Sequence, residues 1–233
     1  MSASVTLEWR EDVAVITVDD GKANALSPAL IAAVNASLDE VDATGSANRA
    51  VVLRGREGMF SGGFDLNVMR SGDVDAISAL VTSGGELVLR LFGSERPIVC
   101  ACTGHAVAAG ALLALGSHLR VGTGGDYRIG LIETAIGMVL PDWAVVIAEE
   151  RLSRTQVQRA VVEARVYSPS EAKDAGFLDL VVPPEEVVRV ATEEAARLGA
   201  LEPLAYAGNA SKLRGRAIAR LTAAVAKDRS GPP

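Results

Sequence analysis

Residues 97–141, PIVCACTGHAVAAGALLALGSHLRVGTGGDYRIGLIETAIGMVLP, decide the fold of this chain. This stretch predicts an apolar strand over 98–102, a turn of small residues over 104–110 and a buried helix from 111 to about 117. A second pair of strands is expected before Glu133, a carboxylate among apolar residues. The rest of the chain is therefore expected to be arranged around a strand, a tight turn and a helix.

The chemistry of this stretch comes from its turn and its carboxylate. A small-residue turn that enters a helix directs backbone N–H groups at one spot, where they can stabilise a developing oxyanion. Glu133 lies among Leu131, Ile132 and Ile136, and burying a carboxylate there is costly unless it is paired, protonated or used. The pattern indicates a site that forms an enolate and moves a proton on carbon. Taken alone, the run of small residues is more typical of tight helix–strand packing than of a functional turn, and Glu133 is what favours the functional interpretation.

A second turn of the same kind precedes this stretch. Residues 49–54 predict a strand, and the loop 57–66 that follows contains the pair Gly62-Gly63. Paired glycines at a strand-to-helix junction allow a ligand to approach the backbone closely, and the following helix offers further N–H donors. This loop is a second candidate for binding an oxyanion, although Gly-Gly also fits an ordinary turn.

Composition limits the classes of function. The chain has 233 residues, of which 49% are hydrophobic and 22% charged, so it can bury a substantial core. A net charge of −6 and no basic cluster argue against nucleic-acid binding and against attraction to anionic membranes. No stretch is apolar enough to span a bilayer, and the N-terminus has a strand pattern, so we expect a cytoplasmic protein. Cys100 and Cys102 share one face of a strand as buried thiols, and no metal site is expected.

The order of the elements predicts an α/β core followed by helices. Residues 4–19 predict a hairpin broken at Glu11-Asp12, and Ser27-Pro28 begins a helix over 28–41. A helix over 74–93 is expected to be interrupted near Gly84-Gly85. After Pro141 we expect helices at 143–153, 153–166, 168–176, 184–198 and 201–227, with a strand near 178–183. Ser168-Pro169-Ser170-Glu171 is expected to cap the helix over 168–176. The predicted division is a core over 1–180 and a helical region over 181–233.

Four motifs in this order resemble the crotonase (enoyl-CoA hydratase/isomerase) superfamily: FSGGFDL at 60–66, GHAVAAGALLAL at 104–115, YRIGLIETAIGMVLP at 127–141 and SPSEAKDAGFLDLVVP at 168–183. The resemblance covers nearly the whole chain. It implies a spiral of ββα units, with C-terminal helices that assemble a homotrimer or a hexamer made of two trimers. It also implies an acyl-CoA thioester as the substrate and no separate cofactor.

By motif position, the resemblance implies that the backbone N–H groups of Phe64 and Ala109 hold the thioester oxygen. Hydratases of the family carry one glutamate where this chain has Leu112 and another in the motif that contains Glu133. A Δ3,Δ2-enoyl-CoA isomerase needs only one carboxylate, which moves a proton from C2 to C4. The isomerase is therefore the favoured activity, with Glu133 as the acid and base. The substrate is further expected to contact Ala25, Ser61, Gly62, Gly63, Asp65, Leu66, Gly110, Leu112 and Trp143.

Asp142 keeps other activities open. It lies nine residues after Glu133, near the place where dienoyl-CoA isomerases of the family carry a second carboxylate. If it faces the pocket, a hydratase or dienoyl-CoA isomerase is possible; otherwise it is an N-cap of the helix that begins at Trp143. A third alternative is a non-catalytic acyl-CoA-binding protein that retains the two N–H donors.

Overall fold

The computed structural model describes residues 5–44 and 50–229. Its larger sheet has six strands in the order β1-β2-β3-β5-β7-β10. β1 (Val5–Arg10) and β2 (Val13–Val18) form the predicted antiparallel hairpin, and every other neighbouring pair in this sheet is parallel. The remaining strands are β3 (Ala50–Arg54), β5 (Ile98–Cys102), β7 (Leu119–Thr123) and β10 (Leu180–Val182). Arg49, predicted to begin a strand, lies outside the described residues.

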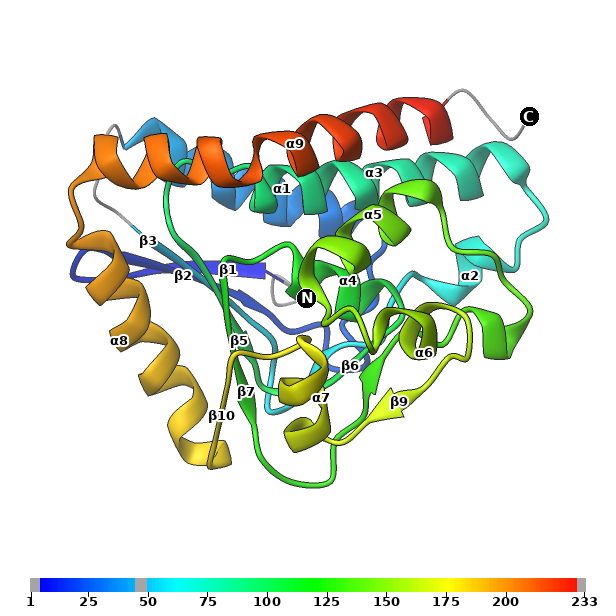
Figure 1. Ribbon diagram of the computed structural model, residues 1–233, viewed down its shortest axis with the longest axis horizontal. Coiled ribbons are helices and arrows are strands. Elements are labelled where there is room, and N and C mark those ends of the chain that lie inside the picture. The colour runs from blue at the N-terminus through cyan, green and yellow to red at the C-terminus, as the bar shows by residue number, and fades with distance from the viewer. Residues whose placement is uncertain (1–4, 45–49, 230–233) are drawn as a thin grey trace.

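The chain also forms a second, smaller sheet. Its strands are β4 (Gly58–Ser61), β6 (Gly104–Val107), β8 (Ile129–Gly130) and β9 (Val166–Tyr167), in that order across the sheet. The chain passes from β3 to β4, from β5 to β6 and from β7 to β8, so each time it leaves the larger sheet for the smaller one before a helix. This repeat confirms the predicted spiral of ββα units (Figure 1).

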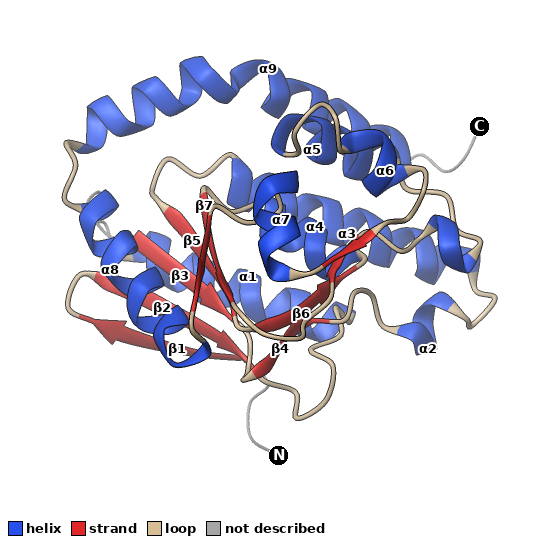
Figure 2. Cartoon of the chain, turned by 60° about the horizontal axis from the view of Figure 1, so that its bottom comes forward, coloured by secondary structure: helices blue, strands red, loops and turns tan. Residues whose placement is uncertain are grey.

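The two faces of the larger sheet have separate hydrophobic cores. Alternate residues of β5 show the separation, because Val99 and Ala101 pack toward α8 (Val187–Gly199), whereas Cys100 and Cys102 enter the main core. α8 covers its face of the sheet (Figure 2). The main core lies under α1 (Pro28–Ala43), α3 (Val74–Phe92) and α4 (Ala109–Leu115). Both cysteines are buried free thiols, as expected.

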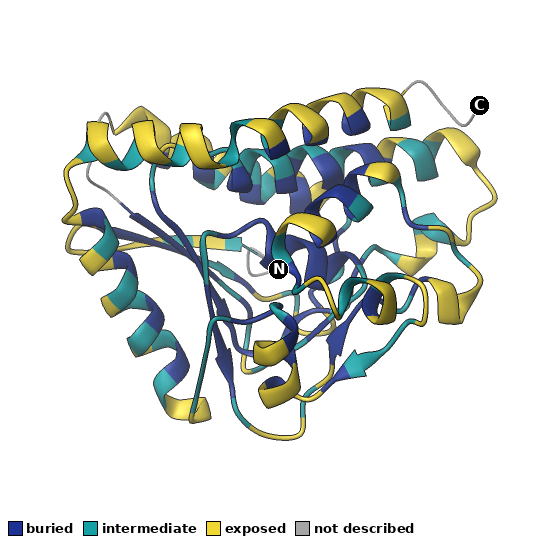
Figure 3. Ribbon diagram, viewed as in Figure 1, coloured by how far each residue is buried: buried dark blue, intermediate teal, exposed yellow. Residues whose placement is uncertain are grey.

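The C-terminal helix α9 (Pro203–Arg229) runs along α3 and α5 (Asp142–Arg151) (Figure 1). Its buried residues are Ala217, Leu221, Ala224 and Val225, all in its second half, whereas residues 203–216 are exposed or half-buried (Figure 3). Short elements complete the chain: α2 (Leu66–Met69), the 3₁₀ turns η1 (Thr134–Ile136) and η2 (Pro184–Glu186), α6 (Val157–Val161) and α7 (Pro169–Ala175). No helix within the described ranges is long and apolar enough to cross a bilayer.

Local capping signals are confirmed. Ser27 accepts a hydrogen bond from the Leu30 N–H at the start of α1, with Pro28 as the first helical residue. At α7, Ser168 and Glu171 form a capping box in which each side chain binds the backbone of the other. Both motifs depend only on residues within one turn, so the sequence is sufficient to predict them.

Three predicted elements are wrong. The helix expected over 153–166 is only α6, followed by β9, which pairs with β8. The small-residue turn over 104–110 contains β6, and α4 begins at Ala109 rather than at residue 111. α3 is continuous through Gly84-Gly85, where we expected an interruption. In each case tertiary packing overrides the local pattern.

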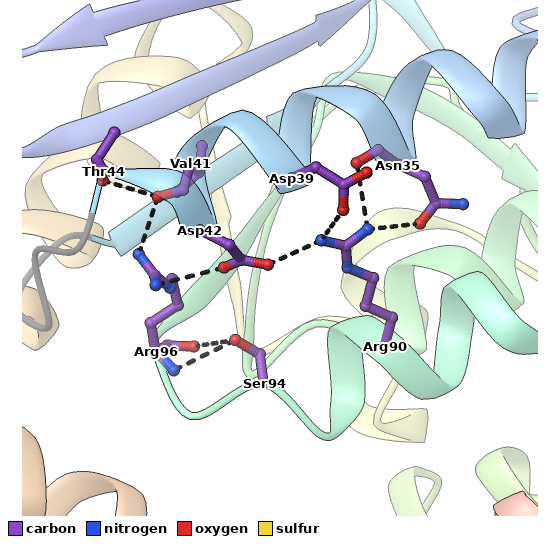
Figure 4. A network of polar contacts seen from close by, with 8 residues as sticks. All are labelled: Asn35, Asp39, Val41, Asp42, Thr44, Arg90, Ser94 and Arg96. Carbon is purple, nitrogen blue, oxygen red and sulfur yellow. Dashed lines mark hydrogen bonds and ion pairs between the residues drawn. The ribbon is translucent and has the colours of Figure 1, made fainter.

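The C-terminal end of α3 is tied to α1 by a polar network (Figure 4). Arg90 Nη2 lies 2.8 Å from a carboxylate oxygen of Asp39 and 2.8 Å from one of Asp42, and Arg90 Nη1 donates to the Asn35 carbonyl at 3.1 Å. Arg96 pairs with Asp42 at 3.3 Å. These partly exposed pairs fix the helix ends relative to each other more than they add stability.

Candidate active site

Two strand-to-helix turns touch backbone to backbone at the predicted site. Gly63, at the end of the β4 turn, has a φ of +96°, and a Cβ there would lie 2.9 Å from Cβ of Ala108 and 3.4 Å from the Ala109 nitrogen. A Cβ on Gly110 would lie 2.3 Å from the Ser61 carbonyl oxygen. Only glycine fits at both positions. The structure therefore brings together the two glycine-containing turns that the sequence predicted separately.

Among the described residues, no group accepts a hydrogen bond from the backbone N–H of Phe64 or Ala109. Leu26 donates to the Gly63 carbonyl at 2.8 Å and accepts from the Asp65 N–H at 3.1 Å, so the parallel bridge uses the groups on either side of Phe64. Ala109 is the first residue of α4, where an N–H has no intrahelical acceptor. Neither N–H has a partner within residues 5–44 and 50–229. Both remain available to a ligand oxygen.

The turn before α4 is strained and is tied to the strand that leads to Glu133. Ala108 has φ +53° and ψ −132°, a conformation that costs a residue with a Cβ about 1 kcal/mol or more. Its N–H donates to the carbonyl of Gly130 in β8 at 2.9 Å, and its carbonyl accepts from the Ala111 N–H at 2.9 Å. A backbone hydrogen bond thus joins the turn at Ala108 to Gly130, which lies three residues before Glu133.

Glu133 is buried and underpaired. The residue is 7% exposed, and its Oε2 has no hydrogen-bond partner in the described part of the chain. Burial raises the pKa of the Glu133 carboxyl above its ordinary 4.5, and the backbone N–H groups of Glu133 and Ile132 offset this only in part. Its carbonyl accepts from Ile136 at 3.1 Å and Met138 at 2.9 Å, which fixes the backbone. The carboxyl group is positioned to take up and hold a proton.

The apolar surroundings of Glu133 are less complete than expected. Leu131 is buried and Ile132 half-buried, but Ile136 is 53% exposed. Leu112 lies fully buried in α4. The segment after Glu133 is therefore partly exposed at Ile136 and does not form a complete apolar wall.

Asp142 does not occupy the N-cap position, and its side chain forms an ion pair. It is the first residue of α5, whose N-cap is Pro141, so the predicted N-cap is one residue out. Its side chain is exposed, and one carboxylate oxygen lies 2.6 Å from Nζ of Lys227 in α9. This ion pair gives Asp142 a role in joining α5 to α9.

Sequence reasoning missed Asn24. This residue is fully buried with φ +49°, and its Nδ2 donates to the carbonyls of Val18, Met59 and Phe60 at 2.9 to 3.2 Å. The Ser61 hydroxyl donates to the Asn24 carbonyl at 2.8 Å and accepts from the Gly63 N–H at 3.3 Å. Asn24 thus holds the loop before α1 against the Gly62-Gly63 turn. The available signal was an Asn, which tolerates positive φ, in a loop with Gly21.

Some of the other predicted substrate contacts lie at the two turns, and the rest lie in α2 or α5 or next to them. Ala25, Ser61, Gly62 and Gly110 lie at or beside the touching turns, and Asp65 caps α2 by accepting from the Asn67 N–H at 2.9 Å. Leu66 is 53% exposed in α2. Trp143 is 1% exposed, and its indole packs against Gly85 of α3.

Over residues 5–44 and 50–229, these features define a ββα-spiral protein with two N–H donors that lack partners at touching turns and with a buried carboxylate, Glu133. The chain belongs to the enoyl-CoA hydratase/isomerase family, whose model matches residues 8–230. This confirms the resemblance and the crotonase fold.

Relatives in the family differ in their named activity. The chain is 30% identical over 186 residues to human mitochondrial enoyl-CoA delta isomerase 1, covering 79% of this chain and 62% of that protein. It therefore spans about three fifths of that relative's length. It is 28% identical over 207 residues to a probable enoyl-CoA hydratase of Bacillus subtilis, covering 86% of this chain and 78% of that protein. A protein of Mycobacterium tuberculosis is named an enoyl-CoA isomerase in one solved structure and a probable enoyl-CoA hydratase in another. The first of these structures is similar over 100% of both chains, with 36% identity and a TM-score of 0.94.

Proposed function

We propose that this protein binds acyl-CoA thioesters and isomerises 3-enoyl-CoA to 2-enoyl-CoA, with Glu133 as the only acid and base. The observation that carries the proposal is a buried carboxyl whose Oε2 has no hydrogen-bond partner in the described part of the chain, three residues after the strand end that is hydrogen-bonded to the turn at Ala108. The family relationship supports the substrate class, and two of the similar proteins are named as isomerases.

In this mechanism the thioester oxygen accepts hydrogen bonds from the N–H groups of Phe64 and Ala109. The Glu133 carboxylate removes a proton from C2, and the C–H electron pair moves into the thioester to give a dienolate. Each N–H donor stabilises the negative oxygen, by about 3 kcal/mol in related acyl chemistry. The protonated Glu133 then returns the proton to C4, which moves the double bond to C2–C3.

The raised pKa of Glu133 suits both steps. A carboxyl group that holds its proton more tightly than usual is a stronger base toward C2 and keeps the proton until C4 is in place. Leu112 supports isomerisation over hydration, because hydration needs a second group to activate water and this side chain is apolar and buried. Asp142, paired with Lys227 on the surface, gives no support to a second carboxylate in the site.

The test is to incubate the purified protein with 3-enoyl-, 2-enoyl- and 2,5-dienoyl-CoA and to resolve the products by mass spectrometry and NMR. We expect 3-enoyl-CoA to become 2-enoyl-CoA without a change of mass. A product of 2-enoyl-CoA heavier by one water would make the protein a hydratase instead. Binding without turnover of any substrate would leave a non-catalytic acyl-CoA-binding protein.

A further inference from the structure

The middle of α3 carries two adjacent glycines, Gly84 and Gly85, both buried in a continuous helix. A glycine in a helix interior destabilises the helix relative to alanine. Here the missing Cβ atoms make room for two aromatic rings that come from different elements.

The first ring belongs to Phe64. A Cβ on Gly84 would lie 2.5 Å from Cε1 and 2.6 Å from Cζ of this ring, and the three nearest atoms outside the helix all belong to the Phe64 side chain. The backbone of Phe64 is held on its other side by the bridge to Leu26. Ring and bridge together fix the direction of the Phe64 N–H.

The second ring belongs to Trp143. A Cβ on Gly85 would lie 2.8 Å from Nε1 and 2.9 Å from Cδ1 of the indole. Trp143 is the second residue of α5 and lies two residues after Pro141, where the segment that begins at Glu133 ends. Its Nε1 has no partner in the described part of the chain, so packing against α3 holds the ring in place.

We infer that the Gly84-Gly85 pair is a positioning element. It packs against the Phe64 and Trp143 rings, and so fixes the turn that carries the Phe64 N–H relative to α5, the helix that follows the Glu133 segment. α3 is a firm base for this because Arg90 ties its end to α1 and Glu86, next to Gly85, pairs with Arg229 of α9 (Figure 4 shows the Arg90 contacts). The inference rests on the proposed function where it concerns catalysis.

The catalytic test uses Gly84→Ala with and without Phe64→Leu. The added methyl displaces the ring and tilts the N–H turn, so we expect Gly84→Ala to lower kcat about 10- to 100-fold and to change KM less than about threefold. Leucine keeps the backbone N–H but removes the ring, so in a Phe64→Leu background Gly84→Ala should lower kcat less than about threefold. Ser83→Ala, on the same helix, is the control and should leave kcat unchanged.

A second test needs no activity. The chain has two tryptophans, so a Trp9→Phe background leaves Trp143 as the only indole reporter. Gly85→Ala should shift the Trp143 emission maximum to longer wavelength as the ring leaves its buried seat, and Ser83→Ala should not. Thermal melts of each variant confirm that it is folded under the assay conditions.

The outcomes separate this inference from the proposed function. If the wild type turns over no enoyl-CoA, the proposed function fails, while the fluorescence test still decides whether α3 seats Trp143. Wild-type kcat in Gly84→Ala, or a loss that Phe64→Leu does not relieve, would overturn the positioning role. An unshifted emission maximum in Gly85→Ala would overturn the seat for Trp143.

Discussion

At the scale of single residues, the proposed activity depends on Glu133. Glu133→Gln keeps the shape of the side chain but cannot accept a proton, so we expect isomerisation to fall at least about 10³-fold. Acyl-CoA affinity, measured by calorimetry, should stay within about threefold. Asp142→Asn is the matched control, because this exposed carboxylate pairs with Lys227, and it should cost less than about threefold. Full activity in Glu133→Gln would refute the mechanism.

The buried Glu133 carboxylate also links stability to pH. Its pKa in the folded state lies above 4.5, so the folded chain binds this proton more tightly than the unfolded chain. The resulting stabilisation is complete below pH 4.5 and is lost as the pH rises through the folded-state pKa. Glu133→Gln should therefore raise Tm at pH 7 relative to wild type, and the gain should shrink at pH 4. Scanning calorimetry at both pH values checks the sign, and a lower Tm at pH 7 would contradict it.

At the scale of elements, an ion pair holds the edge strand β10 to β7. Arg120 in β7 has a side chain only 6% exposed, and its Nε and Nη2 donate to Asp179 at 2.8 Å and 2.6 Å. Burial alone would raise the pKa of the Asp179 carboxyl, but the hydrogen bonds and charge of Arg120 outweigh it and hold that pKa below 3.8. The Asp179 carboxylate thus provides the charged partner of the buried Arg120 guanidinium.

We expect Asp179→Asn to lower the free energy of unfolding by about 3 kcal/mol at pH 7, because it leaves Arg120 without a charged partner. Urea denaturation measures this. The folded-state pKa of Asp179 is depressed, so its contribution to the free energy of unfolding is present above pH 3.8 and is lost as the pH falls through the folded-state pKa. The difference in stability between wild type and Asp179→Asn should therefore narrow only in that acid range. Glu193→Gln, which removes an exposed pair with Arg189 on α8, is the control and should leave the free energy of unfolding nearly unchanged.

At the scale of the whole molecule, the last helix leaves apolar side chains uncovered. Leu204 is 83% exposed and Leu213 is 81% exposed on α9. We expect these residues to be covered by other copies of the chain in a trimer or hexamer, as the family resemblance implies. Sedimentation should give three or six times the monomer mass of 24.1 kDa, and Leu213→Glu should shift the mass downward. A monomer at micromolar concentration would contradict this prediction.

The cytoplasmic location, the absence of a separate cofactor and the division at residue 180 also remain predictions. The human relative is named as mitochondrial, so the location of this protein needs its own measurement, for which fractionation of the source cells is sufficient.

Local signals in the sequence determined a large part of this protein. The hairpin follows from alternation of apolar residues, the starts of α1 and α7 follow from Ser27 and Ser168, and each of these depends on residues close in the chain. Glu133 stood out because a carboxylate in an apolar run is costly wherever the run folds, and it is indeed buried.

Contacts between distant segments follow from the three-dimensional packing of the chain. That Gly63 touches Ala108, that Gly84 and Gly85 receive two rings, and that Asp142 pairs with Lys227 are contacts between residues at least 20 positions apart. The same holds for β9, which pairs with β8 where the local pattern favoured a helix. Periodicity and capping report the preferences of one segment alone, whereas these contacts depend on which backbone groups the folded spiral brings within hydrogen-bonding or van der Waals distance.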